Sequence, residues 1–128
     1  MVRVFRTRTF TRWMKKAGLT DEALAGAVSE MVAGLVDADL GGHLVKKRVA
    51  LPGQGKRSGA RTIVATRMAE RWIYLYGFAK NERANIDKVE LKALQEVAKE
   101  LLNFDDRQLA IALSKGELEE VCDANEDS

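Results

Sequence analysis

The sequence is poor in the residues that build covalent or metal-held frameworks. It contains one cysteine, Cys122, one histidine, His43, and one proline among 128 residues. A single cysteine excludes an internal disulfide framework and fits a reducing compartment. A lone histidine makes no metal-ligand set, and Cys122 has no histidine near it in sequence that would activate it as a nucleophile. We therefore expect no metal and no cofactor, and a structural role in a loop for His43.

Long apolar runs are absent as well. The longest covers only residues 72–79, whereas a membrane-spanning helix needs about 20 apolar residues. The N-terminus lacks the apolar core of a signal peptide, and the chain shows neither repeats nor a linker. These features predict one cytoplasmic domain over residues 1–121 with no membrane partner. Residues 122–128 are acidic and lack apolar anchors, so we expect a frayed tail.

Charge is abundant but unevenly distributed. Residues 1–83 hold 16 Lys and Arg against 7 Asp and Glu, a net charge of +9, and residues 84–128 hold 5 against 12, a net charge of −7. Basic blocks of this density are typical of phosphate-binding surfaces. They are equally typical of a solvated face that acidic segments of the same chain neutralise. Charge alone leaves both interpretations open.

Periodicity and capping residues predict an α+β domain. Thr20 is suited to cap a helix, and Asp87 with Glu90 has the spacing of a capping box. Alternating apolar residues indicate strands that follow one another closely, which favours an antiparallel meander. We expect residues 37–43 to form a turn-rich loop. The expected strands are 2–9, 44–51, 60–67 and 71–78, and the expected helices are 9–17, 20–34, 87–102 and 105–116.

Basic side chains gather on one face of the predicted meander. Because side chains alternate between the faces of a strand, Lys46 and Arg48 share one face. Arg61 begins the next strand, and Lys80 follows the third, which makes it a further candidate for the same face. Several cations on one concave face repel one another unless a polyanion compensates their charge. The glycine-rich loop 52–60 between the first two strands does not match a P-loop.

Such a face is suited to metal-free cleavage of RNA. The 2′-hydroxyl attacks its own phosphate when a base removes its proton, a cation stabilises the phosphate oxygens and an acid protonates the leaving oxygen. A lysine crowded by cations, such as Lys46, suits the base or the acid, and Arg61 suits a bidentate phosphate contact. A ribonuclease that uses two histidines is excluded. The aromatics Trp72, Tyr74 and Tyr76 fit either a core or a base-stacking role, and the core role is favoured.

Five motifs in order resemble a known family. They are DADLGG at 37–42, KKRVA at 46–50, PGQGK at 52–56, GART at 59–62 and GFAKNE at 77–82. As a set they are similar to the RelE/HigB-type toxins of bacterial type II toxin–antitoxin systems, over roughly residues 2–121. The resemblance implies a RelE-like α+β fold, with two N-terminal helices packed on a small twisted antiparallel sheet and with C-terminal helices.

The same resemblance implies a function and its residues. The expected protein is a ribosome-dependent endoribonuclease that cleaves translated mRNA and is silenced by a cognate antitoxin. Its expected partners are mRNA, the ribosome and that antitoxin, a helix-turn-helix protein encoded beside it. The expected catalytic residues are Lys46, Arg48, Arg61 and Lys80, and the expected RNA-binding residues are Lys47, Lys56, Arg57 and Arg83.

Two other functions stay open at this point. One is a ParE-like toxin that inhibits DNA gyrase by binding, and the basic cluster argues against it because that branch generally lacks such a set. The other is a non-catalytic module that grips RNA or a protein partner. Steep salt dependence of RNA binding without cleavage would favour this last function.

Overall fold

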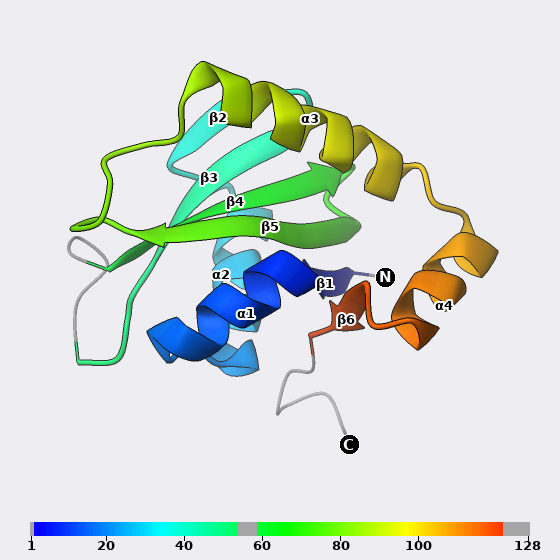
Figure 1. Cartoon of the computed structure of the whole chain (residues 1–128), viewed down its shortest axis with the longest axis horizontal. Helices are drawn as coiled ribbons and strands as arrows, with labels where there is room; N and C mark the ends of the chain where they lie inside the picture. The colour runs from blue at the N-terminus through cyan, green and yellow to red at the C-terminus, as the bar shows by residue number, and fades with distance from the viewer. Residues whose placement is uncertain (1, 54–58, 122–128) are drawn as a thin grey trace.

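A six-stranded sheet forms the middle layer of the molecule, and helices cover both of its faces (Figure 1). The computed structural model describes residues 2–53 and 59–121. Across the sheet the strand order is β2-β3-β4-β5-β1-β6. The strands are β1 (Arg3–Thr7), β2 (Ala38–Gly41), β3 (Leu44–Val49), β4 (Ala60–Arg67), β5 (Arg71–Ala79) and β6 (Leu118–Glu120). The helices are α1 (Arg8–Ala17), α2 (Asp21–Val32), α3 (Lys88–Leu102) and α4 (Asp106–Ser114).

The helices begin where the sequence places capping residues. The Thr20 side chain accepts a hydrogen bond from the backbone N–H of Ala23 and so satisfies a donor in the first turn of α2. Asp87 and Glu90 form the predicted capping box at the start of α3, and Asp105 caps α4. These three helix starts are confirmed.

The sheet is mixed, which corrects the expectation of an antiparallel one. Strands β3, β4 and β5 form the predicted antiparallel meander, but β1 pairs with β5 in parallel. Parallel neighbours need a long crossover, and here α1, α2 and three strands lie between β1 and β5 along the chain. The first element is β1, within the strand predicted at residues 2–9, so the two N-terminal helices follow a strand. Short β6, which the sequence did not indicate, pairs antiparallel with the outer edge of β1.

The expected loop at residues 37–43 contains a strand, which is a second correction. Residues 38–41 form β2, which pairs antiparallel with β3 along one edge of the sheet. Gly41, Gly42 and His43 have positive φ values of 78°, 60° and 66° and make the turn into β3. Glycines and polar residues obscured this strand in the sequence because they are rare inside strands and common in turns.

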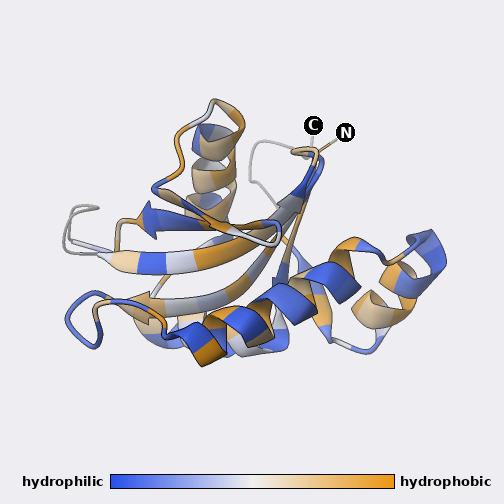
Figure 2. Cartoon of the chain, turned by 90° about the horizontal axis from the view of Figure 1, so that it is seen from above, coloured by the Kyte–Doolittle hydropathy of each residue, from blue (hydrophilic) through white to orange (hydrophobic). Residues whose placement is uncertain are grey.

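Two hydrophobic cores lie on opposite faces of the sheet. Helices α1 and α2 cover one face, where Phe10, Leu24 and Tyr74 are fully buried. Helices α3 and α4 cover the other face, and the outer side of α3 is largely hydrophilic (Figure 2). Within the described residues, no helix has the length and apolar content needed to cross a membrane.

One end of the second face remains uncovered by α3. The α3 residues Ala98 and Leu102 are buried against Ala65 and Ile73, toward one end of β4 and β5. The opposite end of these strands carries the basic residues that the sequence analysis singled out. The fold therefore presents them beside α3 rather than beneath it.

Candidate functional site

The candidate site contains two cross-strand rows, that is, lines of residues paired across neighbouring strands. The first row crosses β3, β4 and β5. Arg48 of β3 lies directly opposite Arg61 of β4, and Arg61 lies opposite Phe78 of β5. Gly59 permits this register, since a Cβ atom there would lie 2.6 Å from the carbonyl oxygen of Val49. The start of β4 can thus approach the end of β3 closely. Arg61 is partly buried and donates a hydrogen bond from Nη1 to the carbonyl oxygen of Ala60 at 3.5 Å.

The second row lies two residues away along each strand, on the same face of the sheet. Lys46 is opposite Ile63, and Ile63 is opposite Tyr76. Lys46 is partly exposed and makes no ion pair or side-chain hydrogen bond with any residue that the structure describes. Lys80 follows β5 directly, is exposed, and donates its backbone N–H to the carbonyl oxygen of Gly59. The backbone thus brings Lys80 to the end of β4 that carries Arg61.

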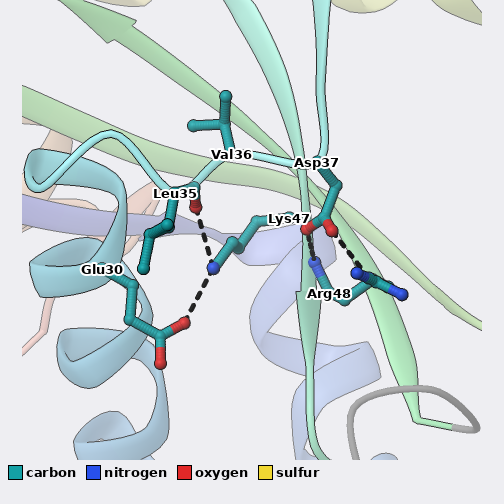
Figure 3. A pocket seen from close by; sticks show the side chains of 6 residues that line it. All are labelled: Glu30, Leu35, Val36, Asp37, Lys47 and Arg48. Atoms are coloured by element: carbon teal, nitrogen blue, oxygen red, sulfur yellow. Dashed lines mark hydrogen bonds and ion pairs between the residues drawn. The ribbon is translucent and has the colours of Figure 1, made fainter.

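Asp37 holds Arg48 at the rim of this face. Its Oδ2 accepts the backbone N–H of Arg48 at 2.7 Å, and its Oδ1 accepts the Arg48 Nε–H at 2.6 Å (Figure 3). Burial raises the pKa of Asp37, but the two hydrogen bonds from Arg48 outweigh that cost, and the net pKa is lowered. Asp37 therefore stays ionised. Because Nε is engaged, the two η nitrogens of Arg48 form the edge that remains for an anion.

Lys47 lies on the opposite face of β3 from Lys46 and Arg48. Figure 3 shows Lys47 and Arg48 leaving the strand on opposite sides. The Lys47 side chain is only 6% exposed, and Nζ donates to Glu30 Oε1 at 2.7 Å and to the carbonyl oxygen of Leu35 at 2.8 Å. The ammonium group of Lys47 is thus engaged by α2 and the segment after it, and Lys47 does not share the face of Lys46 and Arg48. An open pocket of about 290 Å³ borders both residues.

Arg83 is held by the start of α3. Its Nη1 and Nη2 donate to the two carboxylate oxygens of Glu90, and Nη1 also donates to the hydroxyl of Tyr76 at 3.2 Å. Its Nε donates to the carbonyl oxygen of Asn85. The hydrogen bonds with Arg83, followed by that from the Asp87 backbone, lower the pKa of Glu90 to about 2, and the Glu90 hydrogen bond raises the pKa of Arg83. The pair is ionised at neutral pH.

Some residues singled out in the sequence fall outside the described part of the chain or away from this face. Lys56, Arg57 and Cys122 lie outside the described residues. His43 is exposed in the turn between β2 and β3, and its carbonyl oxygen accepts the backbone N–H of Thr66. In the part of the chain that the structure describes, no three His, Cys, Asp or Glu residues are grouped to hold a metal ion.

The basic residues of the N-terminal part of the chain fall into two groups, one with acidic or carbonyl partners and one without ion pairs to the described residues. At the β1 edge, Arg3 pairs with Glu120 at 2.9 Å and Arg6 pairs with Glu119 at 2.9 Å. Arg8 donates to the carbonyl oxygens at the end of α4. The acidic C-terminal segment thus neutralises the N-terminal arginines, whereas Lys46 and Lys80 have no such partner among the described residues. The interpretation of a neutralised face therefore holds for the N-terminal arginines, whereas the charges of Lys46 and Lys80 are not neutralised by an ion pair with the described residues.

Sequence reasoning missed three contributors to the site. Asp37 begins the first of the five motifs, but the motif gave it no role, because its contact with Arg48 depends on the unexpected β2–β3 hairpin. Glu90 was recognised as a capping residue, but its second role toward Arg83 requires the loop between β5 and α3. For Tyr76 the strand pattern favoured the core over base stacking, yet the residue is partly exposed and its hydroxyl accepts a hydrogen bond from Arg83.

Comparison with known proteins supplies one result. The family model described as the RelE toxin of the RelE/RelB toxin–antitoxin system matches residues 2–121. This span includes all the residues described above as forming the site. No curated protein matches the chain.

Proposed function

The chain belongs to the family of RelE toxins of RelE/RelB toxin–antitoxin systems, and from that premise we propose that it is a ribosome-dependent endoribonuclease that cleaves translated mRNA. Its proposed site is the face formed by Lys46, Arg48 and Arg61, with Lys80 at its end. Toxins of this family pair with an antitoxin, and we propose an adjacently encoded helix-turn-helix protein as that partner. The family membership supports the class of reaction, and the site supports the roles given below.

The proposed reaction uses the RNA as its own nucleophile. The 2′-hydroxyl oxygen attacks the adjacent phosphorus, the bond to the 5′ oxygen of the next nucleotide breaks, and a 2′,3′-cyclic phosphate and a 5′-hydroxyl result. One basic residue takes the proton of the 2′-hydroxyl, and another group protonates the leaving oxygen. Lys46 and Lys80 are the proposed proton carriers. No water molecule is consumed in this step.

The two arginines are suited to the charge that develops on the phosphate. A guanidinium offers paired N–H donors that match two phosphate oxygens, and it stays protonated throughout. Arg48 and Arg61 lie opposite each other in adjacent strands, and neighbouring strands are about 5 Å apart. One phosphate can therefore reach both. This cross-strand pair is the observation that carries the proposal, because fixed cations at developing charge are worth the most in catalysis.

The test is to map mRNA cuts after brief induction in cells, with Arg61→Ala beside the wild type. Removing one fixed donor to the transition state typically costs about 100- to 1,000-fold in rate, so we expect cuts within translated codons to disappear. Arg67→Ala is the matched control, because Arg67 lies on the same strand and its Nη1 contacts Asn103 at the end of α3. Cuts should persist in this control.

Two results would replace the proposal with one of its alternatives. Growth arrest with intact messages and inhibited supercoiling would indicate a gyrase-directed toxin. Salt-dependent binding to ribosomes carrying a message, without cuts in any codon, would indicate a binding module. Cuts that persist when translation initiation is blocked would remove the ribosome from the mechanism.

A further inference from the structure

The N–H groups of Arg83 are nearly all engaged within the protein. A guanidinium has five N–H donors, and four bonds occupy those of Arg83: Nε to Asn85, Nη1 to Tyr76 and Glu90, and Nη2 to Glu90. Within the described residues, this leaves one N–H group for a ligand. A bidentate phosphate contact needs two. Arg83 is therefore poorly suited to hold a phosphate, unlike Arg48 with its η edge.

Besides this one N–H group, the Arg83 side chain can present the flat surface of its guanidinium to a ligand. Its Cζ lies 5.7 Å from the ring centroid of Phe78, which is 2% exposed. The Arg83 side chain itself is 32% exposed. The guanidinium thus joins a group of planar side chains that also includes Tyr76, whose ring centroid is 6.1 Å from that of Phe78. Planar cations over aromatic support are favourable stacking surfaces for nucleobases.

This planar group adjoins the proposed cleavage site. Tyr76 shares a cross-strand row with Lys46, and Phe78 shares one with Arg61. Two strand spacings separate β3 from β5, which is about 10 Å. A single strand of RNA whose phosphate lies between Arg48 and Arg61 thus has a neighbouring base within reach of Arg83.

We propose that Arg83, fixed by Glu90 and flanked by Tyr76 and Phe78, is the stacking platform for one nucleobase of the bound RNA. The Glu90 carboxylate holds the guanidinium plane, so the base meets a surface that is already ordered. This inference rests on the proposed function, because it concerns the RNA at that same site. It gives Arg83 a different task from Arg48 and Arg61, namely contact with a base rather than with a phosphate.

The test measures binding rather than cleavage. Ribosomes carry a message whose A-site codon consists of 2′-deoxynucleotides, so the message has no 2′-hydroxyl to attack and stays intact. The base at each codon position is then removed in turn, and the Kd of the wild-type protein is measured on each message. Stacking of one base is worth about 5- to 100-fold in affinity. We expect loss of the base at one position to weaken wild-type binding about 10-fold.

Arg83→Lys then separates stacking from other roles. Lysine keeps the charge but lacks the planar face. We expect this variant to bind the intact message about 10-fold more weakly and to be indifferent to loss of that base. Arg12→Lys, an exposed change on α1, should behave as the wild type. If the losses from the variant and from base removal multiply, or if no base affects wild-type binding, the proposal is overturned.

A second variant keeps the test usable if Arg83→Lys does not fold. Glu90→Gln keeps the guanidinium but loosens its hold, so the effect of base removal should shrink, and Glu96→Gln on the same helix should leave it unchanged. An undiminished effect in Glu90→Gln would contradict the fixed platform. Cleavage of the matching all-RNA message is scored separately. Its absence would remove the proposed function, while a base-dependent Kd would still assign Arg83 to base binding.

Discussion

The two sides of strand β3 differ in how deeply their basic side chains are buried and in how they are paired. On the side of α2, Lys47 is buried and donates to both Glu30 and the carbonyl oxygen of Leu35. On the other side, Lys46 is partly exposed without an ion pair among the described residues, and Arg48 is 47% exposed and tethered by Asp37. These three consecutive basic residues therefore have distinct surroundings, although the sequence presents them as one cluster.

The difference follows from the cost of burying charge. A buried ammonium group must be paired, since removing it from water costs several kcal/mol. A partly exposed cation remains hydrated and can exchange that water for an anionic ligand. Consecutive basic residues on a strand should therefore be assigned to the two faces of the sheet separately, and not treated as one patch. The buried Lys47 side chain contributes to the fold, whereas on the other face Lys46 is partly exposed and Arg48, although held by Asp37, is 47% exposed.

The sharpest way to break this comparison is to neutralise Lys46. We expect Lys46→Met to lower the rate of mRNA cleavage by about 100- to 10,000-fold, the range for loss of a general acid or base. Its unfolding free energy should change by less than about 0.5 kcal/mol, as for most substitutions on the surface. Single-turnover cleavage on programmed ribosomes and urea unfolding measure the two quantities. Equal loss of stability and activity would place Lys46 in the fold instead.

The same substitution one residue later should have the reverse effect. Lys47→Met removes the ammonium group that donates to Glu30, and we expect it to lower the unfolding free energy by about 2–4 kcal/mol in urea at neutral pH. The value lies below that of a fully buried pair because Glu30 is 34% exposed. The protein that remains folded should cleave at the wild-type rate. Lys47→Met with Glu30→Gln should recover part of the stability. Normal stability with lost cleavage would instead support Lys47 as an RNA-binding residue.

Local signals in the sequence were enough to locate most of the fold. Caps such as Thr20 and Asp87 act within one turn of helix, so their effect is visible in a few residues. The strand at Ala60–Arg67 was predicted at its observed bounds because apolar residues run through it. The parallel partner of β1 was missed because it lies far along the chain. Strand β2 was missed because its residues favour turns.

The shared face of Lys46 and Arg48 in the candidate site was predictable from the sequence, but the acidic residues that hold the basic side chains were not. Alternation along a strand places Lys46 and Arg48 on one face, and this needs no knowledge of the rest of the chain. The same alternation puts Lys47 on the other face, yet nothing in the sequence pairs it with Glu30. The contact of Asp37 with Arg48 likewise depends on the tertiary path of the chain. Carboxylates that orient cations act across space, so sequence spacing does not reveal them.

A smaller effect tests whether cleavage requires Asp37 to hold the exposed Arg48 side chain in place. Asp37→Asn leaves one oxygen to accept a hydrogen bond where the carboxylate accepts two from Arg48. We expect about a 10-fold fall in kcat/KM for cleavage, the worth of one hydrogen bond to a charged group. Asp39→Asn is the control, because the asparagine oxygen can still accept the Gly41 N–H. If both variants cleave as the wild type does, Arg48 needs no tether.

The smallest expected effect is a pH-dependent change in stability when the ion pair between Glu90 and Arg83 is removed. The pKa of Glu90 is lowered from its ordinary value of 4.5 to about 2 by Arg83. The stabilisation from a lowered pKa is complete above the unfolded value and is lost as pH falls through the folded value. The Tm of Glu90→Gln should therefore lie below that of the wild type at pH 7, and the gap should close between about pH 4.5 and 2. The matched Glu96→Gln should show a smaller gap at neutral pH, because Glu96 is exposed. A Glu90→Gln gap that persists unchanged at pH 2 would mean that the glutamate acts through packing at the start of α3 rather than through its charge.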